Sequence, residues 1–165
     1  MNSLNGSRAR NILACTFAAV LGCASSAAAN FTIDFPAGLA CAFELRIDGS
    51  GGNQIERDFF DKNGNLVRSI TAGTGSALTF TNVGTGATVS TISNGAVSQV
   101  TPNPDGSQTF VNTGHNILIL FPTDVPAGPS TTLYVGRVVF TVDPSGNFTL
   151  QGHSGTATNI CAVLS

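Results

Sequence analysis

The chain has 165 residues, of which only 10% are charged and 42% are hydrophobic. Seven Lys and Arg stand against nine Asp and Glu, which gives a formal net charge of −2 at pH 7. These few cations are scattered along the sequence. They argue against nucleic acid as a partner, because phosphate binding needs a dense basic surface, and they offer no basic patch for an anionic membrane.

The first 29 residues have the three parts of a secretory signal. Two arginines precede the apolar stretch Ile12–Leu21, and small residues follow it. This stretch is shorter than the roughly 20 residues that span a bilayer. Ala27 and Ala29 fit the small positions of a cleavage site, so we expect cleavage after Ala29, with Ala28 as the alternative, and a secreted, extracellular protein.

A second interpretation treats Val20-Leu21-Gly22-Cys23 as a bacterial lipobox that anchors the protein through a lipid on Cys23. The bulky Leu21 stands where a small residue is usual, so the ordinary signal is preferred. Residues 30–165 then form a single all-β domain that is long enough to bury a core. No further stretch of membrane length follows, so we predict no membrane span.

Residues 30–165 contain two cysteines, Cys41 and Cys161. An oxidising extracellular compartment makes a disulfide between them the expected state. Free thiols and an intermolecular disulfide are the alternatives.

Short stretches with period-two alternation recur between clusters of Gly, Asn, Asp and Pro, which is typical of strands joined by tight turns. In Cys41–Asp48, for example, the apolar Cys, Phe, Leu and Ile alternate with Ala and charged residues. The turn sequences DKNGN, NVGTG, NPDGS and DPSGN supply residues that tolerate positive φ. The further predicted strands are Asn30–Phe35, Gln54–Phe60, Leu66–Ala72, Ala77–Asn82, Ala87–Ser93, Ala96–Thr101, Gln108–Asn112, Asn116–Phe121, Leu133–Asp143, Asn147–Gly152 and Thr156–Val163.

A meander of this size closes into a barrel or folds into a two-layer sandwich, because an open sheet leaves long edges exposed. A disulfide from Cys41 in an early strand to Cys161 in the last strand makes the two ends of the sheet neighbours, as at a barrel seam. We therefore predict an all-β antiparallel meander closed into a β-barrel, lipocalin-like or allene-oxide-cyclase-like in architecture. The alternative is a two-layer β-sandwich with adjacent termini.

A catalytic triad needs a general base, and the sequence offers two histidines for this role. His115 precedes the segment Ile117–Phe121, which is apolar on both faces and should be covered on both. Asp124 follows this segment, so the two side chains meet only if the loop 122–130 folds back. A histidine at a strand entry, bonded to a turn carbonyl, is the simpler interpretation.

Tyr134 completes the set of candidate catalytic residues with His115 and Asp124. These three could serve a barrel-type isomerase or hydrolase with its site near the loop 122–130. His153 stands beside a turn, and we expect its side chain in solvent. Because no convincing catalytic set emerges, a protein without enzymatic activity is the preferred interpretation.

The segment DKNGN places Asp61, Asn63 and Asn65 at the first three ligand positions of a calcium loop. However, Leu66 replaces the required glycine and no glutamate stands at the twelfth position, so the segment is better explained as a hairpin turn. The cysteines and histidines form no zinc pattern. We expect neither a metal nor a cofactor.

Six segments together, ACAFELRIDGSG, DKNGNLVRSITAGTG, LTFTNVGTG, PDGSQTFVNTGHNILILF, GRVVFTVDPSGN and CAVLS, resemble the small secreted proteins of filamentous soil bacteria and fungi. That group brings no established activity, so the resemblance implies secretion and a single domain only. The apolar alternation could fill the fold solidly or line a cavity. We expect a non-catalytic protein that binds a small apolar ligand or a surface partner; the alternatives are the enzyme above and a structural cell-surface module.

Overall fold

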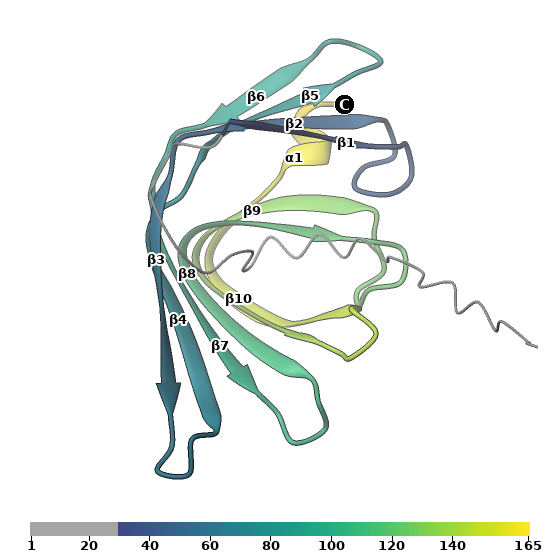
Figure 1. Ribbon diagram of the computed structural model, residues 1–165. Helices are drawn as coiled ribbons and strands as arrows, with labels where there is room; N and C mark the ends of the chain where they lie inside the picture. The colour runs from purple at the N-terminus through teal and green to yellow at the C-terminus, as the bar shows by residue number, and fades with distance from the viewer. Residues whose placement is uncertain (1–29) are drawn as a thin grey trace, which may run out of the picture.

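The computed structural model describes residues 30–165, which form two antiparallel sheets (Figure 1). The small sheet has the order β1-β2-β5-β6, made of β1 (Phe31–Phe35), β2 (Leu45–Ser50), β5 (Ala77–Asn82) and β6 (Thr88–Thr91). The large sheet has the order β10-β9-β8-β7-β4-β3, made of β3 (Asn53–Phe60), β4 (Leu66–Thr74), β7 (Gly95–Pro102), β8 (Gln108–Leu120), β9 (Ser130–Val142) and β10 (Phe148–Asn159). A short helix, α1 (Ile160–Val163), follows β10. The predicted signal, its cleavage site and Cys23 lie outside the described residues.

Neither sheet closes on itself, so the predicted barrel is wrong and the sandwich alternative is favoured. The chain passes between the sheets at three corners: Gly51-Gly52 after β2, Gly75-Ser76 after β4, and residues 92–94 after β6. The corners are bonded to one another, because Gly75 N donates to Asn94 O at 2.8 Å and Ser76 Oγ donates to Gly51 O at 3.1 Å. Strands that change sheets at such corners build a sandwich with crossed layers.

The strands β8, β9 and β10 do not end where the chain changes sheets. Each continues without a break, because it bends at a glycine. Gly114, Gly136 and Gly155 lie opposite one another with φ of 89°, 135° and 93°. A Cβ at any of the three would lie 2.2 to 2.3 Å from a backbone oxygen of a neighbouring strand, so only glycine fits. The bend curls the large sheet, as Figure 1 shows. Because each strand bends at its glycine and does not end there, the strands predicted on either side of Gly114 form one strand, β8. Those predicted on either side of Gly155 likewise form one strand, β10.

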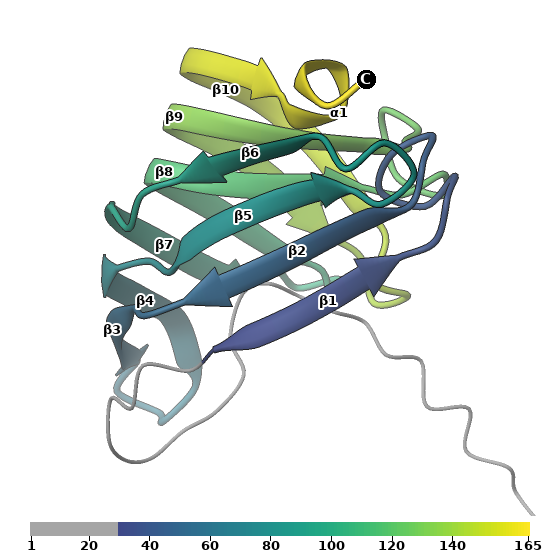
Figure 2. The same ribbon diagram turned by 90° about the horizontal axis from the view of Figure 1, so that it is seen from above.

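Two hydrophobic cores follow from this bend. The first lies between the sheets, where the small sheet covers β8 and β9 (Figure 2). Its buried residues are Phe35, Ala40, Cys41, Leu45, Ile47, Phe80, Ile160 and Leu164. The second lies inside the curl of the large sheet and comprises Phe110, Leu118, Leu120, Tyr134, Val138, Phe140 and Val142.

The segment Ile117–Phe121 contributes to both cores, as its apolar sequence predicted. Ile117 and Ile119 pack against the core between the sheets, whereas Leu118 and Leu120 belong to the core inside the curl. Alternate residues of a strand point to opposite faces, so this strand is covered on both sides.

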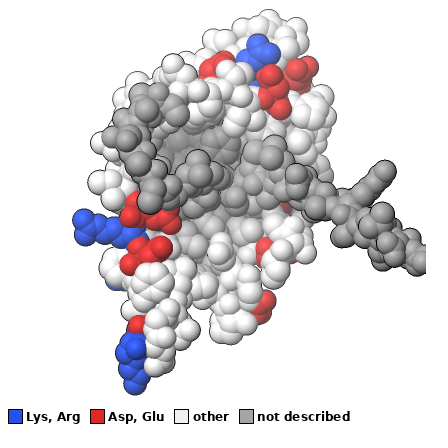
Figure 3. All heavy atoms as spheres, viewed as in Figure 1, with Lys and Arg blue, Asp and Glu red and all other residues white. Residues whose placement is uncertain are grey.

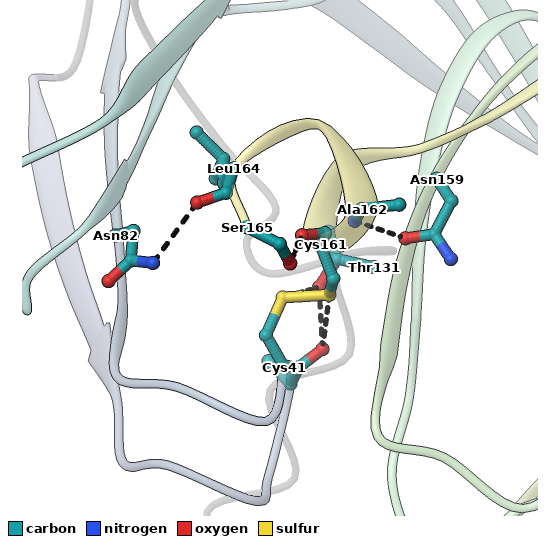
Figure 4. The surroundings of a disulfide bond; sticks show 9 residues. Cys41, Asn82, Thr131, Asn159, Cys161, Ala162, Leu164 and Ser165 are labelled. Atoms are coloured by element: carbon teal, nitrogen blue, oxygen red, sulfur yellow. Dashed lines mark hydrogen bonds between the residues drawn. A yellow bond between two sulfur atoms is a disulfide. The ribbon is translucent and has the colours of Figure 1, made fainter. Parts of the chain in front are cut away.

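The predicted disulfide between Cys41 and Cys161 is confirmed, with the two Cα atoms 5.5 Å apart (Figure 4). It joins a loop to a helix and not two strands. The strand predicted for Cys41–Asp48 begins only at Leu45, and the strand predicted for Thr156–Val163 ends at Asn159.

Asn159 ends β10 because its side chain caps α1 by accepting a hydrogen bond from Ala162 N at 3.0 Å. The loop that carries Cys41 is held from a second side, since Thr131 Oγ1 donates to Ala40 O at 3.0 Å. Asn82 Nδ2 donates to Leu164 O at 3.1 Å (Figure 4). The disulfide, α1 and this loop therefore close one end of the space between the sheets.

Within residues 30–165 the structure has no helix that is long and apolar enough to cross a membrane.

Candidate functional site

The opposite end of the space between the sheets is open and holds a cavity of about 220 Å³. We call it the corner cleft, because residues of two of the corners, Gly75-Ser76 and 92–94, line it. Its polar lining residues are Gln54, Ser76, Thr91, Asn94, Asn112, His115 and Asn116. Its other lining residues are Phe31, Gly75, Leu78, Ile92, Ala96, Ile117 and Leu133.

The corner cleft exists because β6 and β8 diverge there. β7 pairs with β8 only as far as Gly114, and the chain N-terminal to β7 turns away into the small sheet. In the described chain, residues 115–120 of β8 pair with β9 alone, and β6 pairs with β5 alone. One edge of β8 therefore opens into the cleft, and its backbone polar groups face the opening.

Two of the residues that line the cleft have a buried side-chain amide atom without a hydrogen-bond partner: Asn112 Oδ1 and Asn116 Nδ2. Ser98 Oγ, on the residue opposite Asn112 in the sheet, is also buried and unpaired. Leaving such a group unsatisfied costs about 1 to 3 kcal/mol. Asn112 and Asn116 flank Gly114 on the face of β8 that also carries Leu118 and Leu120, so the two unpaired atoms, an acceptor and a donor, lie on either side of the bend.

The apolar side of the cleft is built by the small sheet and by the facing side chains Ile117 and Leu133. Phe31 lies opposite Gly49, and a Cβ at Gly49 would lie 2.2 Å from the Phe31 ring. Because Gly49 has no side chain, the Phe31 ring has room to lie over β2. The cleft thus combines aromatic and aliphatic side chains with amide residues in its lining.

No Asp, Glu, Lys or Arg is among the residues that line the cleft. A charged ligand would lose its hydration there without gaining an opposite charge, which is unfavourable. The lining is therefore suited to an uncharged molecule that is apolar on one side and carries hydrogen-bonding groups on the other.

Of the predicted site residues, only His115 lines the corner cleft. Its side chain is exposed, and the residue lies opposite Val135 of β9. It lies on the face of the large sheet that β8 turns toward the small sheet.

Asp124 lies elsewhere and holds the loop 122–130 in place. Its buried carboxylate accepts hydrogen bonds from Phe121 N at 2.5 Å and from Phe148 N at 2.8 Å. The loop does fold back, but toward the start of β10, where Val125 forms a parallel bridge with Thr149. Both carboxylate oxygens are used by backbone donors, so the contacts of Asp124 are structural.

Tyr134 is also separated from His115. It lies opposite Asn116, on the other face of β8 and β9, and is buried in the core inside the curl. Its ring lies 5.0 Å from the ring of His153, and burial raises the pKa of its phenol above the ordinary value. The residue His153, expected in solvent, is exposed and contacts this ring. The structure brings Tyr134 to His153, and it does not bring His115, Asp124 and Tyr134 together.

The described residues contain no group of three or more His, Cys, Asp or Glu side chains that could hold a metal ion. The segment DKNGN forms a hairpin turn, in which Asp61 Oδ1 accepts from Asn63 N at 2.8 Å and from Asn65 N at 2.9 Å. The Asp61 carboxylate is thus engaged by its own turn.

Sequence reasoning missed Asn112, Asn116 and Gln54 as site residues. The available signal was the segment FVNTGHNILI, in which two asparagines flank a glycine inside an otherwise apolar strand. Amides in a strand interior with no partner in sequence indicate either solvent or a site, and only the fold distinguishes them.

No family model, no curated protein and no solved structure matches this chain. The function is therefore argued from the site itself.

Proposed function

We propose that the protein binds a small uncharged molecule in the corner cleft, without catalysing a reaction on it. The ligand places hydroxyl groups against Asn112 and Asn116 and an apolar side against Phe31, Ile117 and Leu133. A hydroxyl group both donates and accepts, so it can satisfy both unpaired amide atoms. A cavity of about 220 Å³ suits a molecule the size of a monosaccharide or a small alcohol.

The observation that carries this proposal is the pair of unpaired amide atoms on two residues that line the cleft, Asn112 Oδ1 and Asn116 Nδ2. In folded proteins, buried polar atoms nearly always have a partner, and the exceptions require an explanation. A ligand that supplies the missing hydrogen bonds is such an explanation. The separation of His115, Asp124 and Tyr134 favours binding over catalysis, because a nucleophile and its base must lie within hydrogen-bond reach.

We further propose that the protein works outside the cell, in line with the signal sequence. The intramolecular disulfide is compatible with this proposal, since disulfides persist in oxidising compartments.

The proposal is tested by calorimetric titration with glucose, N-acetylglucosamine and cyclohexanol, which differ in their hydroxyl and apolar content. We expect saturable binding of at least one of them, and at least tenfold weaker binding to Asn112→Ala and Asn116→Ala. Asn63→Ala is the matched control, because Asn63 is an exposed turn residue outside the cleft. Equal binding to all four proteins would place the ligand elsewhere, and no binding of any probe would reject this ligand class.

A further inference from the structure

The hairpin of β3 and β4 extends away from the small sheet (Figure 1), and its apolar side chains are exposed. Five of the ten exposed large hydrophobic residues in the described chain belong to it: Ile55, Phe59, Phe60, Leu66 and Val67. Phe60 is 60% exposed and lies opposite Leu66, which is 41% exposed. All eight residues of β3 are exposed.

A second hairpin of the same sheet shows that this exposure does not come from the turn. The turns Asp61–Asn65 and Asp143–Asn147 have the same bonds, with the Asp N donating to the Asn O and the Asn Nδ2 donating back to the carboxylate at 3.0 Å. An apolar pair flanks both turns. In the second hairpin the pair, Val142 and Phe148, packs into the core inside the curl. The equivalent pair in the first hairpin, Phe60 and Leu66, is exposed because neither hydrophobic core extends to β3 and β4.

The same hairpin carries three of the five Lys and Arg in residues 30–165: Arg57, Lys62 and Arg68. These cations are spaced apart in the sequence, but in the fold the three lie on the same hairpin as the exposed apolar side chains. Arg57 and Arg68 lie on the outer face, where the Arg68 guanidinium is 4.5 Å from the centre of the Phe59 ring. Figure 3 shows basic atoms that project outward along this hairpin and acidic atoms on its inner side.

The acidic side chains of the hairpin are directed away from this outer face. Glu56 and Asp58 alternate with Arg57, so they lie on the inner face, where Asp58 Oδ1 accepts from Ser69 Oγ at 2.5 Å. Asp61 is held by its own turn. The outer face therefore combines Ile55 and Phe59 with Arg57 and Arg68, while Phe60 and Leu66 lie at the end of the hairpin beside Lys62. Such a surface fits an anionic, partly apolar partner.

A second copy of the chain fits poorly. In a two-fold dimer, identical surfaces meet. The outer faces would set Arg57 and Arg68 against the same arginines, and the inner faces would set Glu56 and Asp58 against the same carboxylates. Like charges placed directly opposite each other are destabilising.

We propose that the end of the β3–β4 hairpin binds the surface of an anionic lipid bilayer. Phe60, Leu66 and Val67 enter the boundary between headgroups and acyl chains, and Arg57, Lys62 and Arg68 contact the lipid phosphates. Interfacial segments bind in this way, through a modest buried apolar area and electrostatic attraction to anionic lipids. This proposal is independent of ligand binding in the corner cleft.

The test uses a tryptophan reporter, because the chain contains no Trp. The protein carrying Phe60→Trp is mixed with vesicles of phosphatidylcholine and phosphatidylglycerol. We expect a blue shift of the Trp emission and co-sedimentation with the vesicles, both reduced by high salt and by pure phosphatidylcholine. Val163→Trp, an exposed position on α1, is the control that should not shift.

Two further variants separate the apolar and ionic contributions. Phe60→Ser with Leu66→Ser should weaken vesicle binding at least tenfold, whereas Val163→Ser should leave it unchanged. Lys62→Glu with Arg68→Glu should weaken binding to the anionic vesicles only. Failure of Phe60→Trp to shift with any vesicle overturns the proposal. So does concentration-dependent dimerisation without vesicles that Phe60→Ser abolishes, which would identify a second copy as the partner.

Discussion

The carboxylate of Asp124 accepts a hydrogen bond from the backbone N–H of Phe148 at 2.8 Å, although the two residues are 24 positions apart. The second carboxylate oxygen accepts from Phe121 N. One buried side chain thus ties the end of β8 to the start of β10 across the curl of the large sheet.

Asp124→Asn should therefore destabilise the fold. An amide keeps one acceptor but sets an NH₂ group against one of the two backbone donors, so we expect a loss of about 1 to 3 kcal/mol in the free energy of unfolding. Urea denaturation measures it. Glu56→Gln, at an exposed residue of β3, is the control and should change stability by less than about 0.5 kcal/mol. Equal effects of the two substitutions would contradict a structural role for Asp124.

The bend of the large sheet predicts that Gly136 does not accept a side chain. Gly136→Ala would set a Cβ 2.3 Å from Ser154 O at a φ of 135°, so we expect a loss of more than about 2 kcal/mol. Gly84→Ala is the matched control, because its added Cβ would lie 3.5 Å from Asn82 Oδ1, an ordinary contact. Thermal unfolding of the two variants compares them. A Gly136→Ala protein as stable as the control would show that the bend does not require glycine.

The disulfide should add stability by restricting the unfolded chain. It joins residues 120 positions apart, for which the chain-entropy model gives about 4 to 5 kcal/mol. Cys41→Ser with Cys161→Ser should lower the melting temperature, as should reduction of the wild-type protein. A melting temperature unaffected by reductant, with two free thiols titrated in the native protein, would contradict the disulfide.

The hairpin turns predict a loss of stability in acid. The side-chain amides of Asn65 and Asn147 hold the pKa of Asp61 and Asp143, respectively, below its ordinary value. A depressed pKa in the folded state stabilises the fold above the pKa of the unfolded chain. This stability is lost as the pH falls from about 4 through the folded-state pKa.

Asp143→Asn should therefore flatten the dependence of stability on pH between about 4 and 2. Urea denaturation across this range measures the slope. Glu44→Gln removes an exposed carboxylate outside these turns and serves as the control. An identical slope in wild type and Asp143→Asn would show that this turn does not contribute to acid sensitivity.

Much of the fold could be predicted from alternation and turn chemistry, because both are local. The turn DKNGN and the strand Gln54–Phe60 were predicted within one residue of their bounds. The error at α1 arose because Ile160–Val163 is as apolar as a strand, and only the cap by Asn159 ends β10.

The open architecture could not be predicted, because it depends on contacts between distant segments. Glycines in strands can mark a bulge, a bend or a close approach, and only the register shows that Gly114, Gly136 and Gly155 lie in one row. The disulfide fitted a barrel and a sandwich equally well. The corner cleft could not be predicted for the same reason, since its lining residues come from strands of both sheets that meet only in the fold.

The unpaired amide of Asn116 predicts that one substitution can raise the stability of the protein and remove ligand binding. Asn116→Leu removes an unsatisfied buried donor, so we expect it to stabilise the unliganded protein, by up to about 1 kcal/mol, while abolishing ligand binding. Thermal unfolding with and without ligand measures both effects. Destabilisation by Asn116→Leu with unchanged binding would mean that Asn116 serves the fold and not a ligand.

The most direct test of the corner cleft is an NMR titration that follows the side-chain amide resonances of Asn112 and Asn116. Glucose, N-acetylglucosamine and cyclohexanol are added in turn, and the exposed amide of Asn63 is the internal reference. Our account predicts that at least one probe shifts the Asn112 and Asn116 resonances in a saturable way and leaves Asn63 unmoved. If no probe moves either cleft amide, or if all three amides move equally, the corner cleft is not the binding site that we propose.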